Sequence, residues 1–455
     1  MAVEENPGIL LYTRIRKSPY FDASRQHGVR RYSVYNHTYP PRHYGDPVGE
    51  YWALLEGVTL WDVGVERQIE ISGPDAFTFT NMMTPRDLSK CGVRRYSVYN
   101  HTYHPRHYGD PVAEYWALLE GVTLWDVGVE RQIEISGPDA FAFANMMTPR
   151  DLSKCAVRQA KYAFITLPDG GIANDPVLMR LEENRFWLSL ADSDIGLWAL
   201  GLAYHSGLDV TIGEVDVAPV QLQGPKSRAV MADLFGEKIL EIPYYRMSGD
   251  LELEGMRVCV SRTGYTSELG YEIYLHDATA NGTKLWNTVL EAGRPHGLQV
   301  AGPCHIRRIE GGILAFGCDI WYDTNPFEVD MGYTWMVDLD QEADFVGKQA
   351  LQRIKAEGPR RKLVGIEIEG PPVGSYIDNE MIEMYRVLRR GRPVGKVTSA
   401  CHSPRLEKNI GYAMLPIELA EPLGHEFDIE TPAGCHRGVT VPKPFIDPGK
   451  QIPKK

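Results

Sequence analysis

Ser261-Arg-Thr-Gly-Tyr-Thr-Ser-Glu-Leu-Gly-Tyr-Glu-Ile-Tyr-Leu275 runs from a turn rich in glycine and small polar residues into an alternating strand. Within that strand, Glu272 and Tyr274 point to one face, and the residues between and beside them point to the other. A carboxylate among aromatic and aliphatic residues is costly to bury unless something hydrogen-bonds to it. A ring edge that carries an amide and an amine, such as that of a pterin, supplies two donors. Glu272 is therefore either a ligand-binding residue of this kind or a surface residue of a half-buried strand.

Size and composition are those of a soluble globular protein. The 455 residues are enough for two or three domains with separate cores. The hydrophobic content of 43% and the charged content of 24% are ordinary. The net charge of −12 argues against nucleic acid as a main partner, because the basic runs at 360–362 and 389–392 are short.

The cysteines indicate a reducing compartment. There are seven, an odd number, with no C-x-x-C pair and no His/Cys cluster at zinc spacing, so we expect free thiols and no metal. The N-terminus lacks a basic start followed by an apolar core, and no apolar run is long enough to span a membrane. These features predict a cytosolic protein without a membrane partner.

An internal repeat follows an N-terminal segment, residues 1–27. Residues 28–91 recur as residues 92–155 with a period of 64 residues. The two copies differ at four positions, Pro40/His104, Gly49/Ala113, Thr78/Ala142 and Thr80/Ala144. Such similarity indicates a recent tandem duplication or an assembly artefact, since solenoid repeats are shorter and looser. We expect the second copy to be the native one, because its link to the downstream strand is shorter.

The rest of the chain predicts two kinds of structure. Through residue 358, paired strands alternate with single helices, which predicts an α+β fold of sheets with helices on one face. The helices are expected at 50–56 and 114–120, from Pro74 and Pro138 to the Thr-Pro-Arg-Asp motifs, and at 192–204, 224–234, 282–292, 303–315 and 344–357. The strands are expected at 58–63, 68–72, 122–127, 132–136, 161–166, 177–181, 185–190, 208–212, 220–223, 256–260 and 272–275. Residues 359–455 read as a small all-β barrel, with strands at 363–368, 392–399, 410–414, 425–429 and 437–441.

Several motifs in chain order carry a family resemblance. They are Leu222-Gln-Gly-Pro-Lys226, Thr263-Gly-Tyr-Thr266, Gly270-Tyr-Glu-Ile273, Arg308-Ile-Glu-Gly-Gly312, Met331-Gly-Tyr333, Phe345-Val-Gly-Lys-Gln-Ala-Leu351, Gly395-Lys-Val-Thr-Ser399, Ile410-Gly-Tyr-Ala413 and Lys443-Pro444. With these motifs the chain resembles the glycine-cleavage T-protein (aminomethyltransferase) family. The resemblance implies a folate-binding domain of antiparallel sheets with helices, with residues 156–358 as its remainder after the repeat, and a small C-terminal β-barrel. It also implies tetrahydrofolate as cofactor.

Within the family, the chain is more similar to the tetrahydrofolate-dependent demethylases, including those that act on dimethylsulfoniopropionate. Segments such as Glu130-Arg-Gln-Ile-Glu134 and Phe186-Trp-Leu-Ser-Leu190 support this. Aminomethyltransferases carry two acids where this chain has Asn174-Asp175, and Asn cannot act as a general base. The resemblance thus implies methyl transfer from a small methylated donor, dimethylsulfoniopropionate first, to N5 of tetrahydrofolate. An aminomethyltransferase, an aromatic O-demethylase and a non-catalytic folate-binding protein are the alternatives.

Roles follow from the resemblance, position by position. Glu272 would hold the pterin edge and Tyr265 would flank the folate, while Tyr162 and Asn174 would line the pterin pocket and Tyr333 would close it. The bland alternatives are a core aromatic for Tyr162 and a turn former for Asn174.

One arginine and four aromatic residues complete the expected site. Arg308 would pair with the glutamate carboxylate of folate, and one of Arg307 and Arg308 is expected to be a surface charge. A cationic donor would be recognised by aromatic faces. The candidates for this contact are Trp187, Trp321, Tyr322 and Trp335, with Trp187 the weakest. A sulfonium is already a good leaving group, so we assign no acid or base, and Asn174 and Tyr265 would act by positioning. The oligomeric state, a homodimer included, is left open.

Overall fold

The computed structural model describes residues 102–455 except 192, 193, 375–384 and 432, and short pieces before them: 16–17, 29, 31–32, 38–39, 41–43, 50 and 95–99. The chain divides into two units, Met1–Val98 with Asn379–Met381, and Tyr99–Asp378 with Ile382–Lys455. In the first unit, β1 (Arg16–Lys17) pairs with β3 (Thr38–Tyr39), and β2 (Arg31–Tyr32) pairs with β4 (Pro41–His43). The helices and long strands expected in the first repeat copy lie outside the described residues.

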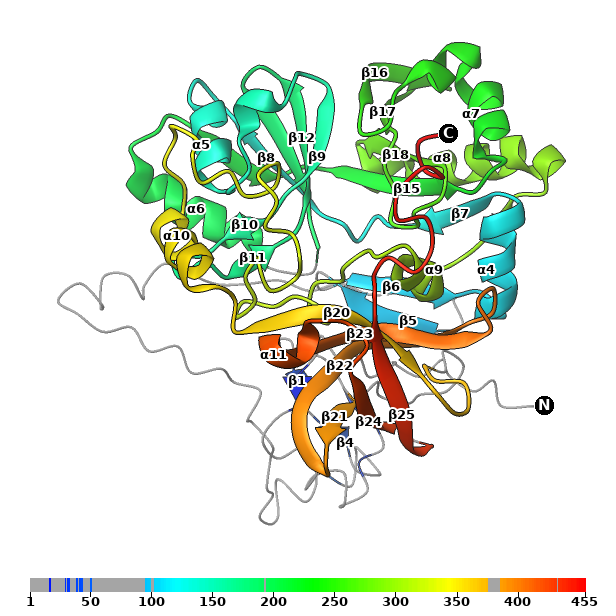
Figure 1. The fold of residues 1–455 in the computed structure, drawn as a ribbon. Helices are drawn as coiled ribbons and strands as arrows, with labels where there is room; N and C mark the ends of the chain where they lie inside the picture. Colours follow the sequence, from blue (N-terminus) through cyan, green and yellow to red (C-terminus); the bar gives the residue numbers. More distant parts are fainter. Residues whose placement is uncertain are drawn as a thin grey trace. The chain divides into compact units, whose positions relative to one another are not determined.

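Two sheets form the larger part of the second unit (Figure 1). The five-stranded sheet has the order β14 (Thr211–Glu214), β8 (Gln132–Ser136), β13 (Arg185–Ser189), β12 (Val177–Glu182), β9 (Gln159–Tyr162). The six-stranded sheet has the order β16 (Met247–Leu253), β17 (Met256–Ser261), β18 (Gly270–His276), β15 (Val217–Gln223), β7 (Thr123–Asp126), β19 (Gln299–Val300). Beside them, β10 (Ile165–Thr166) pairs with β11 (Ile172–Asn174). The pairings are antiparallel, except that β19 runs parallel to β7.

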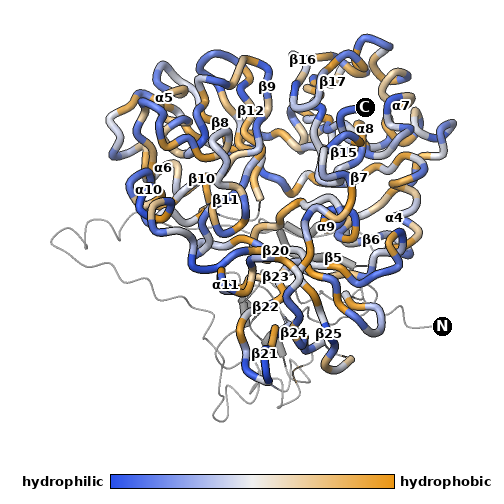
Figure 2. The backbone as a smooth tube through the Cα atoms, viewed as in Figure 1, coloured by the Kyte–Doolittle hydropathy of each residue, from blue (hydrophilic) through white to orange (hydrophobic). Residues whose placement is uncertain are grey.

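Helices cover one face of each sheet, as predicted. Apolar residues of α5 (Ala140–Met146) and α6 (Ile195–Ser206) pack on the five-stranded sheet, while α7 (Ser227–Phe235) and α8 (Ala278–Gly293) pack on the six-stranded one. The other faces meet in a smaller core, to which Met179 and Trp187 contribute from one sheet and Cys259 and Tyr274 from the other. Hydrophobic segments therefore recur along the strands of both sheets (Figure 2). The two sheets thus form layers whose inner faces lie against each other.

The opening strand divides its side chains as its alternation predicts. Tyr271, Ile273 and Leu275 belong to the core under α7 and α8. Tyr274 belongs to the core between the sheets, and Glu272 is bonded to it on the same face. The prediction is confirmed, and it places the carboxylate between the two sheets rather than in solvent.

The second repeat copy contributes a strand to each sheet. Its residues form α4 (Pro111–Glu120), β7, β8 and α5. Three of its four differences from the first copy are alanines inside helices, Ala113 in α4 and Ala142 and Ala144 in α5. Alanine has the highest helix propensity, so these positions favour the two helices.

The C-terminal part forms the predicted closed barrel. Its order is β20 (Arg361–Ile368), β23 (Lys408–Pro416), β22 (Arg392–Ser403), β21 (Arg386–Arg389), β24 (Glu426–Thr431), β25 (Gly434–Val441), with α11 (Ile417–Ala420) packed on β20 and β23. The short strand β21 escaped prediction, because only Val387 and Leu388 separate its terminal arginines and no alternation can be read. It closes the barrel by pairing with β22 and β24.

Three predicted elements differ from the structure. The helix expected at 303–315 is only α9 (His305–Glu310), because Gly312 takes a positive φ of 74° and a side chain there would meet Pro444. The helix expected at 344–357 is α10 (Lys348–Glu357), which begins after Gly347 at φ 87°. The strand expected at 161–166 is divided between β9 and β10.

Both arginines of α9 are buried, so the expectation that one is a surface charge is wrong. Arg308 Nη1 lies 2.5 Å from Asp319 Oδ2, and its Nη2 donates to Ser399 Oγ of the barrel at 2.6 Å. Asp319 in turn accepts a hydrogen bond from Thr398 of the barrel at 2.6 Å.

Among the described residues, none of the helices combines the length and the apolar composition that a membrane-spanning segment needs.

We expect Arg308→Ala to lower the free energy of unfolding by about 3–5 kcal/mol, because it leaves the buried Asp319 carboxylate without its cation. Urea denaturation followed by circular dichroism measures this. Arg353→Ala, on the exposed side of α10, is the control and should change stability little. Equal stability of the two variants would contradict a structural role for the Arg308–Asp319 pair.

Candidate functional site

Glu272 is a buried carboxylate held by three neighbours. Gln221 on β15 lies directly opposite in the strand register, and its Nε2 donates to Glu272 Oε1 at 2.7 Å. The hydroxyl of Tyr274 donates to Oε2 at 2.8 Å, and the hydroxyl of Thr263 donates to the same oxygen. Burial raises the pKa of Glu272, and these three bonds counteract that rise. The side chain has only 3% of its surface exposed, so the reading as a surface residue is wrong.

Unsatisfied acceptors lie beside this carboxylate. Gln221 is fully buried, and its Oε1 has no hydrogen-bond donor within the described part of the chain. A buried amide oxygen without a donor is costly, and native proteins rarely leave one. Glu272 and Gln221 together therefore present acceptor atoms to a ligand that carries N–H groups.

A second glutamate approaches Glu272 from the five-stranded sheet. Glu130 lies just before β8, and its Oε2 accepts a hydrogen bond from Ser189 Oγ at 3.1 Å. Ser189 in turn accepts from Gln132 Nε2 at 3.0 Å. Burial, and then the nearby negative charges of Glu272 and Asp175, raise the pKa of Glu130 to about 8. The two sheets thus bring acidic side chains together across their inner faces.

Tyr162 and Asn174 lie close to this group. The hydroxyl of Tyr162, on β9, donates to Asp175 Oδ2 at 2.9 Å, and burial raises its pKa well above the usual range. Asn174 is fully buried at the end of β11. Its carboxamide bonds the backbone of Ala191 in both directions, at 3.1 Å and 3.3 Å. Asn174 thereby fixes β11 to the chain that follows β13.

Tyr265 lies in the segment between β17 and β18, and Tyr333 lies in the segment between α9 and α10. Tyr265 is partly exposed and donates to the backbone oxygen of Leu314 at 3.3 Å. Tyr333 is half exposed and stacks on Trp335 at 5.9 Å between ring centroids. The guanidinium carbon of Arg150 lies over the ring of Trp335, 5.2 Å from its centroid. Nη1 of Arg150 donates to the backbone oxygen of Tyr162. This chain of contacts joins the exposed aromatic pair to the β9 side of the group.

Arg308 does not present a free guanidinium. Its side chain has no exposed surface, and Asp319, Ser399 and the ring of Tyr412 surround it. The nearby Asp319 charge raises its pKa against the effect of burial. A second carboxylate, such as the glutamate of a folate, would have to displace Asp319 to reach it. In this structure Arg308 joins α9 to the barrel.

The four aromatic candidates for a cationic substrate fall into separate places. Trp187 is fully buried, packs against Tyr274 at 6.1 Å and donates its Nε1 to Glu134 at 2.9 Å, so it is a core residue. Trp321 and Tyr322 are partly exposed and pack on Phe316. Trp187 is linked to Glu272 through Tyr274, whose ring packs on Trp187 and whose hydroxyl donates to the carboxylate. The four do not form one aromatic cage.

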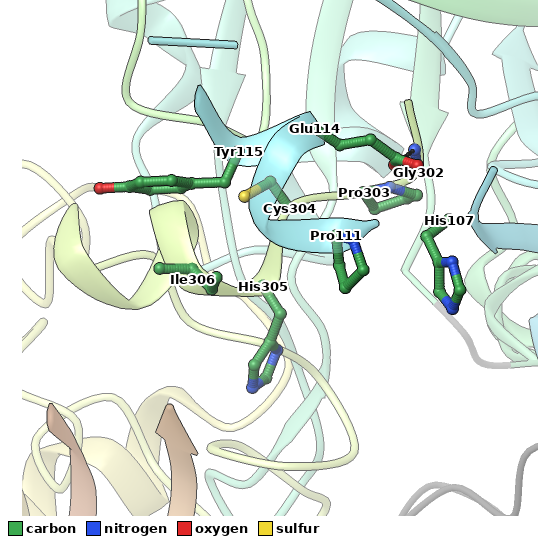
Figure 3. A pocket seen from close by; sticks show the side chains of 9 residues that line it. All are labelled: His107, Pro111, Glu114, Tyr115, Gly302, Pro303, Cys304, His305 and Ile306. Carbon is green, nitrogen blue, oxygen red and sulfur yellow. Dashed lines mark hydrogen bonds between the residues drawn. The ribbon is translucent and has the colours of Figure 1, made fainter. Parts of the chain in front are cut away.

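A separate pocket lies between α4 and α9 (Figure 3). It is lined by residues that include His107, Glu114, Cys304 and His305, none of which the sequence singled out. Glu114 accepts hydrogen bonds there from the backbone of Tyr108, Gly109 and Gly302. Burial raises the pKa of the Cys304 thiol to about 12, so it is not a nucleophile.

Some residues of the buried group escaped sequence reasoning. Glu130, Gln132, Asp175 and Ser189 lie within the motifs that carry the family resemblance, but nothing in those motifs marks them as site residues, and Gln221 lies outside the motifs. Tyr274 could have been found, since the strand alternation already places it on the face of Glu272. The others come from different strands and loops, and only the tertiary contacts bring them together.

Comparison with known proteins agrees with this architecture. Residues 96–341 match the model of the GCVT N-terminal domain, and residues 361–447 match that of the glycine cleavage T-protein C-terminal barrel domain. A dimethylsulfoniopropionate demethylase of Ruegeria pomeroyi is 35% identical over 360 residues, which is 79% of this chain and 94% of that protein. An aminomethyltransferase of Shouchella clausii is 33% identical over 341 residues, 73% of this chain and 88% of that protein.

One solved structure has the same fold. The crystal structure of the glycine cleavage system aminomethyltransferase T from Bartonella henselae aligns with a TM-score of 0.68. It covers 77% of this chain and 94% of that one, at 23% sequence identity.

We expect the stability of the chain to depend on the protonation of Glu130. Because its folded pKa of about 8 lies above the ordinary value, the folded state binds this proton more tightly than the unfolded state. The stabilisation that this proton gives the folded state is complete below the ordinary pKa of a glutamate and is lost as the pH rises through 8. Glu130→Gln, which cannot ionise, should gain roughly 1–3 kcal/mol relative to the parent chain between pH 5 and pH 8.5.

Melting temperatures of both proteins across this pH range measure the effect. Glu183→Gln, in the exposed turn after β12, is the control and should follow the parent at every pH. If Glu130→Gln also ran parallel to the parent, Glu130 would not hold an elevated pKa.

Proposed function

Because this chain belongs to the glycine-cleavage T-protein family, whose members transfer methyl or aminomethyl groups with tetrahydrofolate, we propose that it is a tetrahydrofolate-dependent demethylase. The donor is a small sulfonium, with dimethylsulfoniopropionate as the first candidate. The products are then methylmercaptopropionate and 5-methyltetrahydrofolate. The similarity of 35% over most of the chain to a dimethylsulfoniopropionate demethylase supports this choice of donor.

Asn174 is the observation that carries the choice of plain methyl transfer. Aminomethyl transfer in this family relies on an acid at this position, and a carboxamide cannot accept a proton. Here both ends of the carboxamide are also bonded to the Ala191 backbone. A methyl group on a sulfonium needs no such base, since the leaving thioether is neutral and stable.

The residues between the sheets suit the pterin of tetrahydrofolate. Glu272 and the unsatisfied Oε1 of Gln221 offer acceptors to N–H donors of a ring edge. Tyr162 and Tyr265 would lie along the ring faces, and Tyr333 would cover the entrance. When bound, tetrahydrofolate would supply the lone pair of N5 that accepts the methyl group. The donor's C–S bond would break with its electron pair left on sulfur, and the proton on N5 would go to water.

The chain's contribution to such a displacement is placement and exclusion of water. Holding two reactants in line can supply several kcal/mol of the barrier. Asn174 holds β11, the strand that precedes Asp175, and Tyr274 and Thr263 hold the carboxylate of Glu272 in one orientation. Because these groups are buried and bonded before any ligand arrives, they need little rearrangement when it binds.

The first test is the donor. We expect the purified chain to form 5-methyltetrahydrofolate from tetrahydrofolate and dimethylsulfoniopropionate, measured by liquid chromatography, and not from methoxylated aromatic acids. Formation of 5,10-methylenetetrahydrofolate from an aminomethyl donor would favour the aminomethyltransferase alternative instead. Tight folate binding without turnover of any donor would favour a non-catalytic binding protein.

The second test is the acceptor site. We expect Glu272→Gln to weaken tetrahydrofolate binding about 10- to 100-fold, because hydrogen bonds to a charged acceptor are worth about 1.5–3 kcal/mol. Quenching of protein fluorescence under anaerobic conditions measures the dissociation constant. Glu252→Gln, on the exposed side of β16 in the same sheet, is the matched control. Unchanged affinity in Glu272→Gln would remove this residue from the folate site.

A further inference from the structure

The inner faces of the two sheets hold two carboxylates with no cation. Neither Glu272, which is buried, nor Glu130, which is partly exposed, forms a salt bridge within the described part of the chain, although the buried acids Asp319 and Glu268 do. Burying a carboxylate without a countercharge is costly, and native proteins pair such groups or bind a cation there. The two glutamates, with Asp175 close by, raise one another's cost.

The two carboxylates differ in what they still lack. Glu272 accepts hydrogen bonds from three side chains, which satisfies most of its acceptor sites. Within the described residues, the carboxylate of Glu130 accepts one hydrogen bond, from Ser189. Glu272 therefore suits a ligand with N–H donors, and Glu130 retains capacity for a positive charge.

A second observation points to a ligand at the same place. Gln132 is fully buried, and both bonds of its Nε2 are to Ser189 Oγ and the backbone oxygen of Glu130. Its Oε1 has no donor within the part of the chain that the structure describes. Gln132, whose Oε1 has no donor, and the carboxylate of Glu130 are both bonded to Ser189 Oγ, so both lie beside that hydroxyl and favour a positively charged ligand there.

Two buried aromatic rings, those of Tyr274 and Trp187, lie near these oxygens. Tyr274 is close enough to Glu130 for that charge to raise its pKa, and its ring packs on Trp187. A sulfonium carries a positive charge but no N–H or O–H group, so it is stabilised by carboxylates and ring faces rather than by hydrogen bonds.

We propose that the carboxylate of Glu130, with Gln132 Oε1 beside it, is the contact that recognises the positive charge of the methyl donor. This rests on the proposed function, because it assumes a cationic donor. It assigns the two glutamates different tasks, with Glu272 for the pterin and Glu130 for the onium centre. Once the methyl group has left, the donor's sulfur is neutral and the contact loses its attraction, which favours release of the thioether.

The proposal predicts selectivity for the charged form of the donor. We expect the full chain to bind dimethylsulfoniopropionate more tightly than methylmercaptopropionate, which differs by one methyl group and the charge. Glu130→Gln should reduce the ratio of the two affinities about 10- to 100-fold, because loss of one charge contact at partial burial weakens binding of the sulfonium. Isothermal titration calorimetry gives both dissociation constants.

The number of protons released on binding distinguishes charge recognition by Glu130 from a purely structural role. The groups that face Glu130 are Glu272 and Tyr274 from β18, Asp175 after β11 and Ser189 from β13. Because Glu130 is largely protonated near neutral pH without a ligand, binding of a cation should release a proton from the parent chain. Calorimetric titrations in buffers of different ionisation enthalpy measure the number of protons released on binding. The Glu130→Gln variant should release none.

The control and the outcomes separate this inference from the proposed function. Glu183→Gln should keep the parent's selectivity, and Glu130→Gln should keep the parent's circular dichroism spectrum, which reports that it folds. A parent chain that demethylates the sulfonium without releasing a proton on binding would overturn the role of Glu130, with no variant needed. So would a Glu130→Gln variant with unchanged selectivity. A chain that binds tetrahydrofolate but no onium compound would overturn the proposed function as well.

Discussion

The cost of burying Glu272 is the constraint on which the centre of this molecule depends. Its carboxylate lies between two sheets whose inner faces are otherwise largely apolar. Three hydrogen-bond donors offset that cost. They are Gln221 on the neighbouring strand, Thr263 in the preceding turn and Tyr274, the next residue on the same face. The sequence Thr263 to Tyr274 must therefore keep its turn geometry for the strand to carry this charge at all.

A second buried charge holds the domains in register. Arg308 on α9 is paired with Asp319, and both bond hydroxyl groups of the barrel strand β22. From the barrel strand β23, the hydroxyl of Tyr412 also donates to the backbone oxygen of Ile309 in α9 at 2.8 Å. The residues after β25 then return to the six-stranded sheet, where Arg262 donates to the backbone oxygen of Pro453 at 2.7 Å. Arg308 thus acts between domains, and the match of its motif to the family does not require a direct ligand contact.

Much of the fold could be predicted, and the misses have physical causes. Long strands with clear alternation, such as β8 and β23, were placed within a few residues of their true bounds. Elements were misjudged where glycine with positive φ stopped a helix, as at Gly312 and Gly347, or where tertiary pairing made a strand from an unpatterned segment, as at β21. In the candidate site, Glu272, Tyr162 and Asn174 were named from sequence and lie near one another through a chain of contacts. Glu130 was not, because it precedes its strand and nothing in its own segment marks it as buried.

By itself, the sequence determined the family, the two-part architecture, the internal repeat and the face of Glu272, because these follow from ordered motifs and from the period of a strand. Only the tertiary structure decided that Arg308 is enclosed, that Trp187 is core, and that Glu130 approaches Glu272 from the other sheet. The reason is that burial and charge pairing depend on which faces meet across the two sheets. A strand's alternation gives the two faces of one sheet, but not what lies opposite them.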